Sequence, residues 1–88
     1  MTDEIIDEVR RWLKKADADL RVSMELLDLN EEPWIITFHA QQAIEKYLKA
    51  YLVYKQVKFK KTHDILELLD LCINEDKEFE KLKELDLE

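Results

Sequence analysis

The sequence contains no glycine, one proline and one cysteine among its 88 residues. Tight β-hairpins depend on glycine for positive φ angles, so its absence argues against a β fold. The same absence excludes the glycine-rich loops that let a backbone approach a phosphate closely. The single Cys72 cannot form an internal disulfide, so nothing indicates an oxidising compartment. No apolar run approaches the roughly 20 residues of a membrane-spanning helix, and the acidic amino terminus lacks a signal-peptide core. We therefore expect a cytoplasmic protein without membrane contact.

Acidic residues outnumber basic ones, with 21 Asp and Glu against 14 Lys and Arg, which gives a formal net charge of −7. Such a charge opposes sequence-independent binding to a nucleic-acid backbone, unless the lysines gather on one face. RNA is therefore not an expected partner. Hydrophobic residues make up 47% and charged residues 40% of the chain, a mixture that suits amphipathic helices packed on one another in one domain.

Apolar residues recur at helical spacing in four stretches of the chain. These are Glu4 to about Asp28, Pro33 to about Lys55, a stretch after Thr62 that ends at 74–76, and Glu78 to about Leu85. Thr2 and Thr62 are the expected N-caps of the first and third helices. Trp12 and Trp34 are expected as core or interface anchors. The pattern predicts an all-α fold, namely an up-and-down antiparallel four-helix bundle of three long helices and a short C-terminal one.

The second predicted helix carries a polar strip at three- and four-residue spacing. It consists of His39, Gln42, Lys46 and Lys49. One interpretation is that the strip contacts a nucleotide or a partner protein. The other is that His39 and Gln42 satisfy buried polar groups where two helices meet. Glu45 lies four residues before Lys49, and such a helical ion pair stabilises by only about 0.2–0.5 kcal/mol.

A basic cluster lies in the connection that precedes the third helix. It contains Lys55, Lys58, Lys60 and Lys61. Beside the start of a helix, such lysines can bind phosphate together with free backbone N–H groups. Asp64 would oppose an anion there, and the alternative interpretation is a solvated loop. Lys61 and His63 are therefore secondary candidates for ligand contact.

The two histidines do not predict a metal site. The helix between His39 and Gln56 spans roughly 25 Å, so one chain does not easily bring His39 and His63 onto one ion. Zinc would also lack cysteine ligands. Cys72 lies in an apolar run without basic neighbours, which is typical of a buried structural thiol. We expect no metal, no cofactor and no catalytic residue.

Three blocks of the sequence, in this order and spacing, resemble the HEPN family of small helical proteins. They are Trp12 with Ala16, Asp19 and Leu20; the run from Phe38 to Ala50, which begins Phe-His-Ala-Gln-Gln-Ala-Ile-Glu-Lys; and Thr62-His63-Asp64-Ile65 with Leu68 and Leu69. The resemblance covers most of the chain. It implies a helical bundle that is commonly dimeric. Many members of the family resemble partners of minimal nucleotidyltransferases, in pairs of the toxin–antitoxin kind.

Two departures from the family pattern affect the expected function. Some HEPN proteins are metal-independent ribonucleases that use an arginine followed four to six residues later by a histidine. The last arginine here is Arg21 and the histidines are His39 and His63, so the pair is absent. The chain also ends sooner than most relatives. We expect a single domain over residues 1–88 that lacks the family's last helix, with an exposed apolar face that favours dimerisation.

The polar strip and the resemblance together predict a non-catalytic module in a homodimer, which binds a nucleotide or partners a minimal nucleotidyltransferase. The candidate contact residues are His39, Gln42, Lys46 and Lys49, followed by Lys61 and His63. Two alternatives stay open. One is a HEPN ribonuclease toxin, which the missing arginine–histidine pair disfavours. The other is a homodimeric assembly module without a small ligand.

Overall fold

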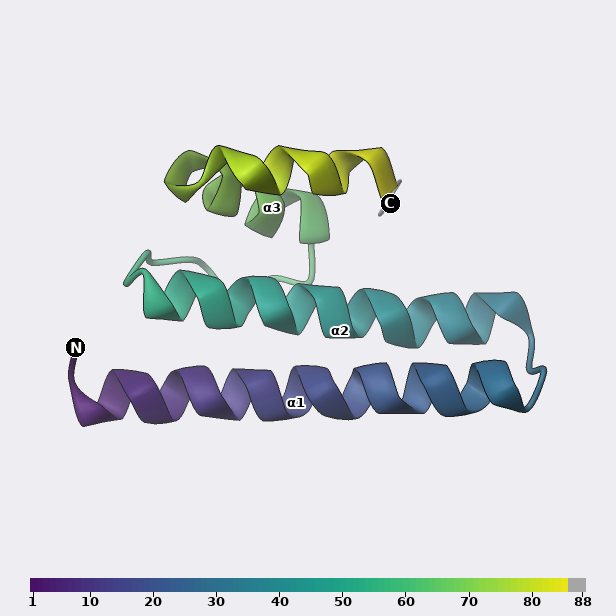
Figure 1. Ribbon diagram of the computed structural model, residues 1–88. Helices are drawn as coiled ribbons and strands as arrows, with labels where there is room; N and C mark the ends of the chain where they lie inside the picture. Colours follow the sequence, from purple (N-terminus) through teal and green to yellow (C-terminus); the bar gives the residue numbers. More distant parts are fainter. Residues whose placement is uncertain (86–88) are drawn as a thin grey trace.

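The computed structural model describes residues 1–85, and these residues form four helices and no strand (Figure 1). The elements are α1 (Asp3–Asp28), α2 (Pro33–Tyr54), α3 (Ile65–Glu75) and the 3₁₀ helix η1 (Lys77–Leu85). The predicted all-α class is confirmed. Within residues 1–85, no helix combines the length and the apolar character that crossing a bilayer requires.

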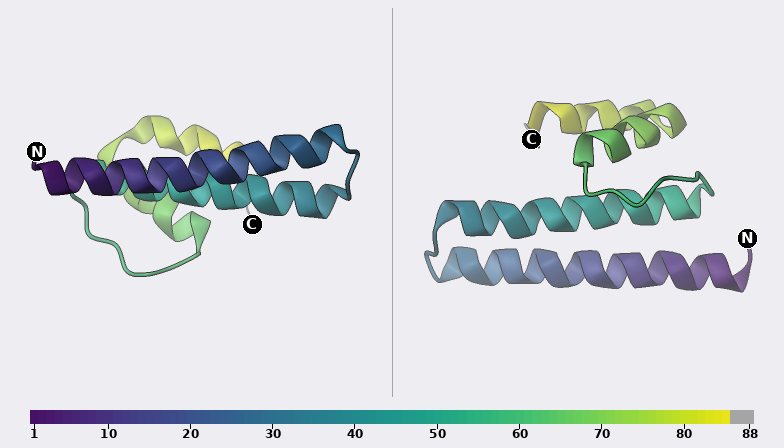
Figure 2. Two further views of the ribbon diagram at one scale, coloured as in Figure 1. Left: turned by 90° about the horizontal axis from the view of Figure 1, so that it is seen from below. Right: turned by 180° about the vertical axis from the view of Figure 1, so that it is seen from behind.

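The first two helices run side by side in opposite directions (Figures 1 and 2). The buried residues of α1 are Ala16 and Ser23, which lie seven positions apart and therefore on one face. Since α1 packs against α2 alone among the described helices, this face contacts α2. The Ser23 hydroxyl donates a hydrogen bond to the carbonyl of Ile36 at 3.1 Å. Small side chains on α1 thus let the two helices approach closely.

The helix starts confirm one predicted cap and correct the other. Thr2 caps α1, because its hydroxyl accepts a hydrogen bond from the N–H of Ile5 at 3.2 Å. The predicted cap of the third helix, Thr62, is wrong. Asp64 is the N-cap, and its carboxylate accepts from the N–H of Glu67 at 3.2 Å. The Thr62 hydroxyl instead accepts from the N–H of Asp64 at 3.0 Å, and this short turn delays the helix by two residues.

Each of the two long helices is followed, two positions after its last residue, by a residue in the left-handed region, although the chain has no glycine. These residues are Asn30, with φ of 54°, and Gln56, with φ of 58°. After α2, the N–H of Val57 donates to the carbonyl of Leu52 at 2.9 Å, and the N–H of Gln56 donates to that of Val53 at 3.0 Å. This is the Schellman arrangement, which usually places glycine at the left-handed position.

The core lies between α2 and α3. Its buried side chains are Leu48 and Leu52 from α2 with Leu68, Leu69 and Cys72 from α3. The views in Figures 1 and 2 show α2 between α1 on one side and α3 with η1 on the other. This middle position explains why apolar residues occur on several sides of the second helix.

The last element differs from the sequence prediction in its geometry. The predicted short helix from Glu78 is a 3₁₀ helix, Lys77–Leu85, and the Phe79 ring packs 4.6 Å from that of Tyr51. The backbones of consecutive helices lie close together in chain order, from α1 to α2, from α2 to α3 and from α3 to η1, and Phe79 adds a side-chain contact between η1 and α2. The helical class is therefore established, whereas the up-and-down four-helix bundle stays a prediction.

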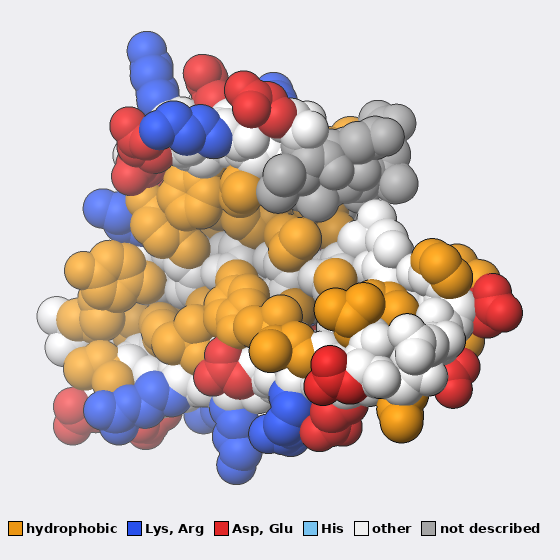
Figure 3. Space-filling model, turned by 45° about the vertical axis from the view of Figure 1, so that its right-hand side comes forward, with side chains coloured by type: hydrophobic (Ala, Val, Ile, Leu, Met, Phe, Trp, Pro, Cys, Tyr) orange, Lys and Arg blue, Asp and Glu red, His pale blue; other side chains and the backbone are white. Residues whose placement is uncertain are grey.

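Large apolar side chains are exposed at the end of the α1–α2 hairpin, where the chain reverses. They include Met24, Leu27, Leu29, Trp34 and Phe38, and Trp34 is 71% exposed. Of the two roles predicted for Trp34, that of a core anchor is therefore wrong, and that of an interface anchor stays a prediction. Figure 3 shows hydrophobic side chains gathered on one face, along the boundary between the hairpin and the layer of α3 and η1.

Candidate ligand-binding site

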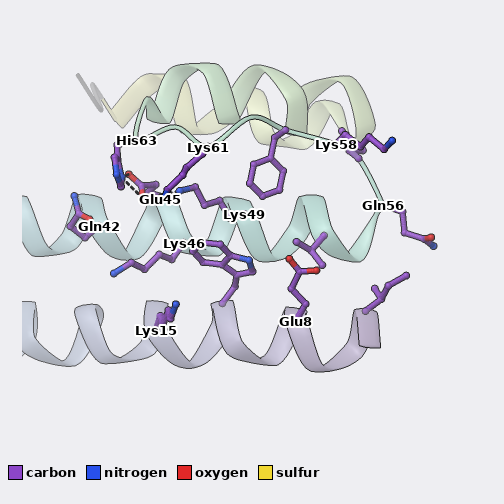
Figure 4. A pocket seen from close by; sticks show the side chains of 15 residues that line it. Glu8, Lys15, Gln42, Glu45, Lys46, Lys49, Gln56, Lys58, Lys61 and His63 are labelled. Carbon is purple, nitrogen blue, oxygen red and sulfur yellow. Dashed lines mark hydrogen bonds and ion pairs between the residues drawn. The ribbon is translucent and has the colours of Figure 1, made fainter. Parts of the chain in front are cut away.

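A groove of about 1190 Å³ lies between α1, α2 and the connecting segment, residues 55–64, that joins α2 to α3 (Figure 4). Five lysines line it, which are Lys15, Lys46, Lys49, Lys58 and Lys61. We call it the lysine groove. Because α1 and α2 are antiparallel, the start of α1 lies beside the end of α2, and the connecting segment leaves α2 at this end to form the third wall.

The lysine groove is positively charged in an acidic protein. Its lining includes five lysines but only two acidic residues, Glu8 and Glu45, whereas the whole chain carries −7. Lys15, Lys58 and Lys61 form no ion pair with any residue in the range 1–85. Figure 4 shows Lys15, Lys46 and Lys61 at the end of the groove near His63. At this end Lys15 and Lys61 present unpaired positive charge to an anionic ligand, whereas Lys46 is paired with Asp19.

The structure brings five of the six predicted contact residues together. Gln42, Lys46, Lys49, Lys61 and His63 all line the lysine groove, as Figure 4 shows. The strip on α2 supplies the first three, and the connecting segment supplies the other two. Residues predicted separately, from a helix and from a loop, thus share one cavity.

His39 is the predicted residue that does not join the others. Its Nδ1 atom lies 3.7 Å from a carboxylate oxygen of Asp19, too far for a hydrogen bond, and it is buried without another partner. Lys46 donates a hydrogen bond to the same carboxylate of Asp19. The polar strip therefore divides: His39 lies beside Asp19 and outside the groove, whereas Lys46 both bonds Asp19 and lines the groove.

A buried carboxylate anchors the wall formed by α2. The Glu45 side chain is 2% exposed, and its Oε2 atom lies 3.3 Å from the Lys49 ammonium, which is itself on a 5% exposed side chain. The four-residue spacing predicted an ordinary helical ion pair, whereas the structure buries both side chains. Nδ1 of His63 lies 3.2 Å from each carboxylate oxygen of Glu45. Glu45 thus contacts Lys49 of its own helix and His63 of the connecting segment.

Trp12, Lys15 and Phe59 line the lysine groove although the sequence did not place them at a site. The ammonium groups of Lys15 and Lys49 lie 5.3 Å and 5.1 Å from the centre of the Trp12 ring, within the range of cation–π attraction. The spacing of Trp12 and Lys15 by three positions places them on one helix face. The sequence spacing therefore predicts that Trp12 and Lys15 share a face of α1. It does not predict which part of α2 this face contacts.

The pKa values of Cys72 and Tyr47, both outside the lysine groove, are raised. Burial raises the pKa of the Cys72 thiol to about 11, and its Sγ atom lies 3.8 Å from the carbonyl of Leu48. A hydrogen bond donated to Asp17 raises the pKa of the Tyr47 hydroxyl, and burial adds to this effect. Cys72 is therefore a structural thiol, as the sequence predicted, and not a nucleophile.

Comparison with known proteins agrees with the resemblance in the sequence. Searches of curated proteins and of solved structures gave no match. A family model described as HEPN domain matches residues 9–86, which include most of α1, the whole of α2 and α3, and the connecting segment. All the lysines of the groove lie within the matched range. Because this match extends over almost the entire sequence, the chain belongs to the HEPN domain family.

Proposed function

We propose that this chain is a non-catalytic HEPN module that binds a nucleotide in the lysine groove. The observation that carries the proposal is the positive charge of this groove within a protein of net charge −7. Lysines without ion pairs bind phosphate groups through charge and hydrogen bonds. The proposed phosphate position is the end of the groove near the unpaired Lys15 and Lys61, with Lys46, which is paired with Asp19, beside them.

The rest of the groove offers surface that suits a nucleobase. Trp12 and Phe59 contribute aromatic rings, and Ile5, Val53 and Val57 contribute aliphatic side chains. Bases stack on aromatic rings with a contribution of about 1–3 kcal/mol. A ligand with one anionic end and one flat apolar end therefore matches the lining better than an inorganic anion alone.

A ribonuclease activity is less well supported. The chain has no arginine followed four to six residues later by a histidine, and its two histidines occupy different surroundings. His39 lies beside Asp19 and His63 beside Glu45, so each ring has a carboxylate neighbour. Incubation of the purified protein with single-stranded RNA tests this alternative, and cleavage that persists in the double variant H39A/H63A would exclude both rings.

Tryptophan fluorescence provides a direct test of nucleotide binding. The chain has two tryptophans, and Trp34 is exposed on the opposite end of the hairpin. In the variant W34F, the signal therefore comes from Trp12 in the groove. We expect ADP to change this signal at low salt, adenosine to bind more weakly, and added salt to weaken the binding of ADP.

Lysine variants then locate the binding site. K15A and K61A should each weaken ADP binding about tenfold, since each removes one charge-assisted contact. The matched control is K77A, because Lys77 is also an exposed lysine without an ion pair in the described chain but lies on η1, outside the groove. An equal loss in K77A, or no response of Trp12 to ADP, would contradict the proposal.

The exposed apolar side chains near the hairpin end favour a second role in assembly. Trp34 is 71% and Phe38 51% exposed, and Met24, Leu27 and Leu29 are each more than half exposed. Large apolar surfaces of this kind mark protein–protein contacts. We propose that they mediate pairing with a second copy of the chain or with a minimal nucleotidyltransferase.

Mass measurement and copurification separate these two partners. A dimer measured by light scattering, which W34A/F38A converts to a monomer, would support pairing between copies. A nucleotidyltransferase recovered in equal amount with the tagged chain, and lost with W34A/F38A, would support the second partner. A monomer that recovers no protein would exclude an assembly role for this surface.

A further inference from the structure

His63 is an exposed residue whose ring contacts a buried carboxylate. Its Nδ1 atom lies 3.2 Å from both oxygens of Glu45, whose side chain is 2% exposed. The His63 side chain itself is 80% exposed. One ring nitrogen is therefore held by a buried carboxylate, while most of the ring remains open to water and to a ligand in the lysine groove.

The carboxylate determines which nitrogen of the ring carries the proton. An ionised carboxylate accepts hydrogen bonds only, so Nδ1 of His63 must be the donor. In neutral histidine, Nε2 then presents a lone pair, which repels an anion. In protonated histidine, Nε2 carries an N–H group and a positive charge, which attract one. A single proton thus converts this edge of the groove from repelling to attracting phosphate.

Two side-chain contacts attach the connecting segment to its neighbouring helices. His63 attaches it to Glu45 of α2, and Lys60 attaches it to Glu67 of α3, with 3.4 Å between Nζ and Oε1. Lys61 lies between these two attachments and lines the lysine groove. The contact between His63 and Glu45 therefore also positions Lys61.

Charges of both signs surround the ring. Glu45 contacts the ring, and the other charged groups that line the same cavities are Lys46 and Lys49 from α2, Glu8 and Lys15 from α1, Lys58 and Lys61 from the connecting segment, and Asp64 at the start of α3. Glu45 and Asp64 favour the protonated ring, whereas the lysines oppose it. An anion that binds among the lysines would cancel their repulsion and so favour protonation.

We propose that anion binding in the lysine groove is linked to the uptake of one proton by His63, with Glu45 as the residue that positions the ring. This inference rests on the proposed function, because it concerns the phosphate end of the same groove. Nε2 of His63 would gain the proton and donate its N–H to the anion, while Nδ1 remains on Glu45. The nucleotide would bind more tightly as the pH falls through the range in which histidine titrates.

The test uses sulfate as the probe, because its charge does not change in this pH range, and ADP as a second probe for the proposed function. Nuclear magnetic resonance of the imidazole protons follows both histidines separately. We expect sulfate to raise the midpoint of the His63 titration by about one pH unit, as an opposite charge at contact distance does. By linkage, sulfate should bind about tenfold more tightly to the protonated form. His39, outside the groove, serves as the internal reference.

Variants separate a proton-linked role from a structural one. H63Q should retain the helical signal by circular dichroism and bind sulfate with no difference between pH 6 and pH 8. H39Q should keep the difference that the natural chain shows. E45Q should shift the pH dependence of sulfate binding to lower pH, because the protonated ring loses its carboxylate partner.

The outcomes distinguish this inference from the function on which it rests. ADP binding together with equal sulfate affinity at pH 6 and pH 8 would overturn the inference and leave the nucleotide proposal intact. A pH dependence that disappears in H39Q but not in H63Q would also overturn it. If neither ADP nor sulfate binds at either pH, both proposals fall.

Discussion

The ammonium of Lys49 lies 3.3 Å from the carboxylate of Glu45, and their side chains are 5% and 2% exposed. Removal of one member of a buried pair leaves an uncompensated charge and typically costs about 3–5 kcal/mol. We therefore expect K49A to lower the free energy of unfolding by about 3 kcal/mol. His63 also contacts Glu45, which keeps the loss at the lower end. Urea denaturation followed by circular dichroism measures this change.

The double variant E45L/K49M is the control for this prediction. Apolar replacement of both partners of a buried pair is often neutral or stabilising, because no buried charge remains. It should therefore be at least 2 kcal/mol more stable than K49A. Equal stability of the two variants would contradict the prediction, because the uncompensated charge of Glu45 in K49A would then cost nothing.

Gln56 should tolerate replacement by glycine with a gain in stability. Its φ of 58° places a side chain in the left-handed region, which costs about 1–2 kcal/mol relative to glycine, and the flexibility of glycine in the unfolded chain offsets part of this gain. We expect Q56G to raise the free energy of unfolding by about 0.5–1 kcal/mol. The midpoint of urea denaturation would show this increase without a change in slope.

The neighbouring position provides the comparison. Lys55 has φ of −79° and ψ of −2°, which any residue adopts, so K55G should lower stability where Q56G raises it. N30G should give a smaller gain than Q56G, because asparagine enters the left-handed region more easily than glutamine. A loss of stability in Q56G would show that the glutamine side chain makes a contribution that outweighs its backbone conformation.

Cys72 should resist alkylation in the folded protein. Burial raises the pKa of its thiol to about 11, so the folded state retains a proton that the unfolded chain releases from about pH 9. Stability associated with this thiol is therefore present below pH 9 and is lost as the pH rises towards 11. The difference in unfolding free energy between the natural chain and C72A, measured at pH 8 and pH 10.5, checks the sign. An unchanged difference would contradict it.

Tyr47 should ionise at higher pH than a free tyrosine. Its hydroxyl donates a hydrogen bond to Asp17, and ionisation would break this bond and place two negative charges together, so the pKa of Tyr47 is raised. The variant D17N should lower the pKa of Tyr47 towards its ordinary value. A titration of the tyrosine ring resonances from pH 8 to pH 12 measures this shift, and identical curves for both proteins would refute the assignment.

Local signals made the helices predictable. Thr2 and Pro33 mark helix starts by chemistry that acts within a few residues, and the bounds of the first two helices agree with the structure to within one residue. The start of α3 was misjudged because Thr62 and Asp64 are both good caps only two positions apart. The turn that the Thr62 hydroxyl forms with the Asp64 N–H leaves Thr62 outside the helix, so Asp64 is the N-cap.

The candidate site was predictable only where it lies on one element. Gln42, Lys46 and Lys49 share a face of α2, so spacing alone grouped them. Trp12 and Lys15 belong to another helix, and their place opposite Lys49 depends on the register between α1 and α2. Register across a helix pair follows from packing of small residues such as Ala16, which a single sequence does not specify.

The order of helix contacts has a consequence for local opening. Among the described helices, α1 contacts only α2, whereas α3 packs on α2 and η1 reaches α2 through the contact of Phe79 with Tyr51. The layer of α3 and η1 can therefore separate from α2 while the hydrogen bonds within the hairpin remain intact. Such an opening would carry away the connecting segment and with it one wall of the lysine groove. Binding competence would then be lost at a smaller free energy than global unfolding. A ligand in the groove should accordingly slow hydrogen exchange most at the amides of α3, a helix that contributes no residue to the lining.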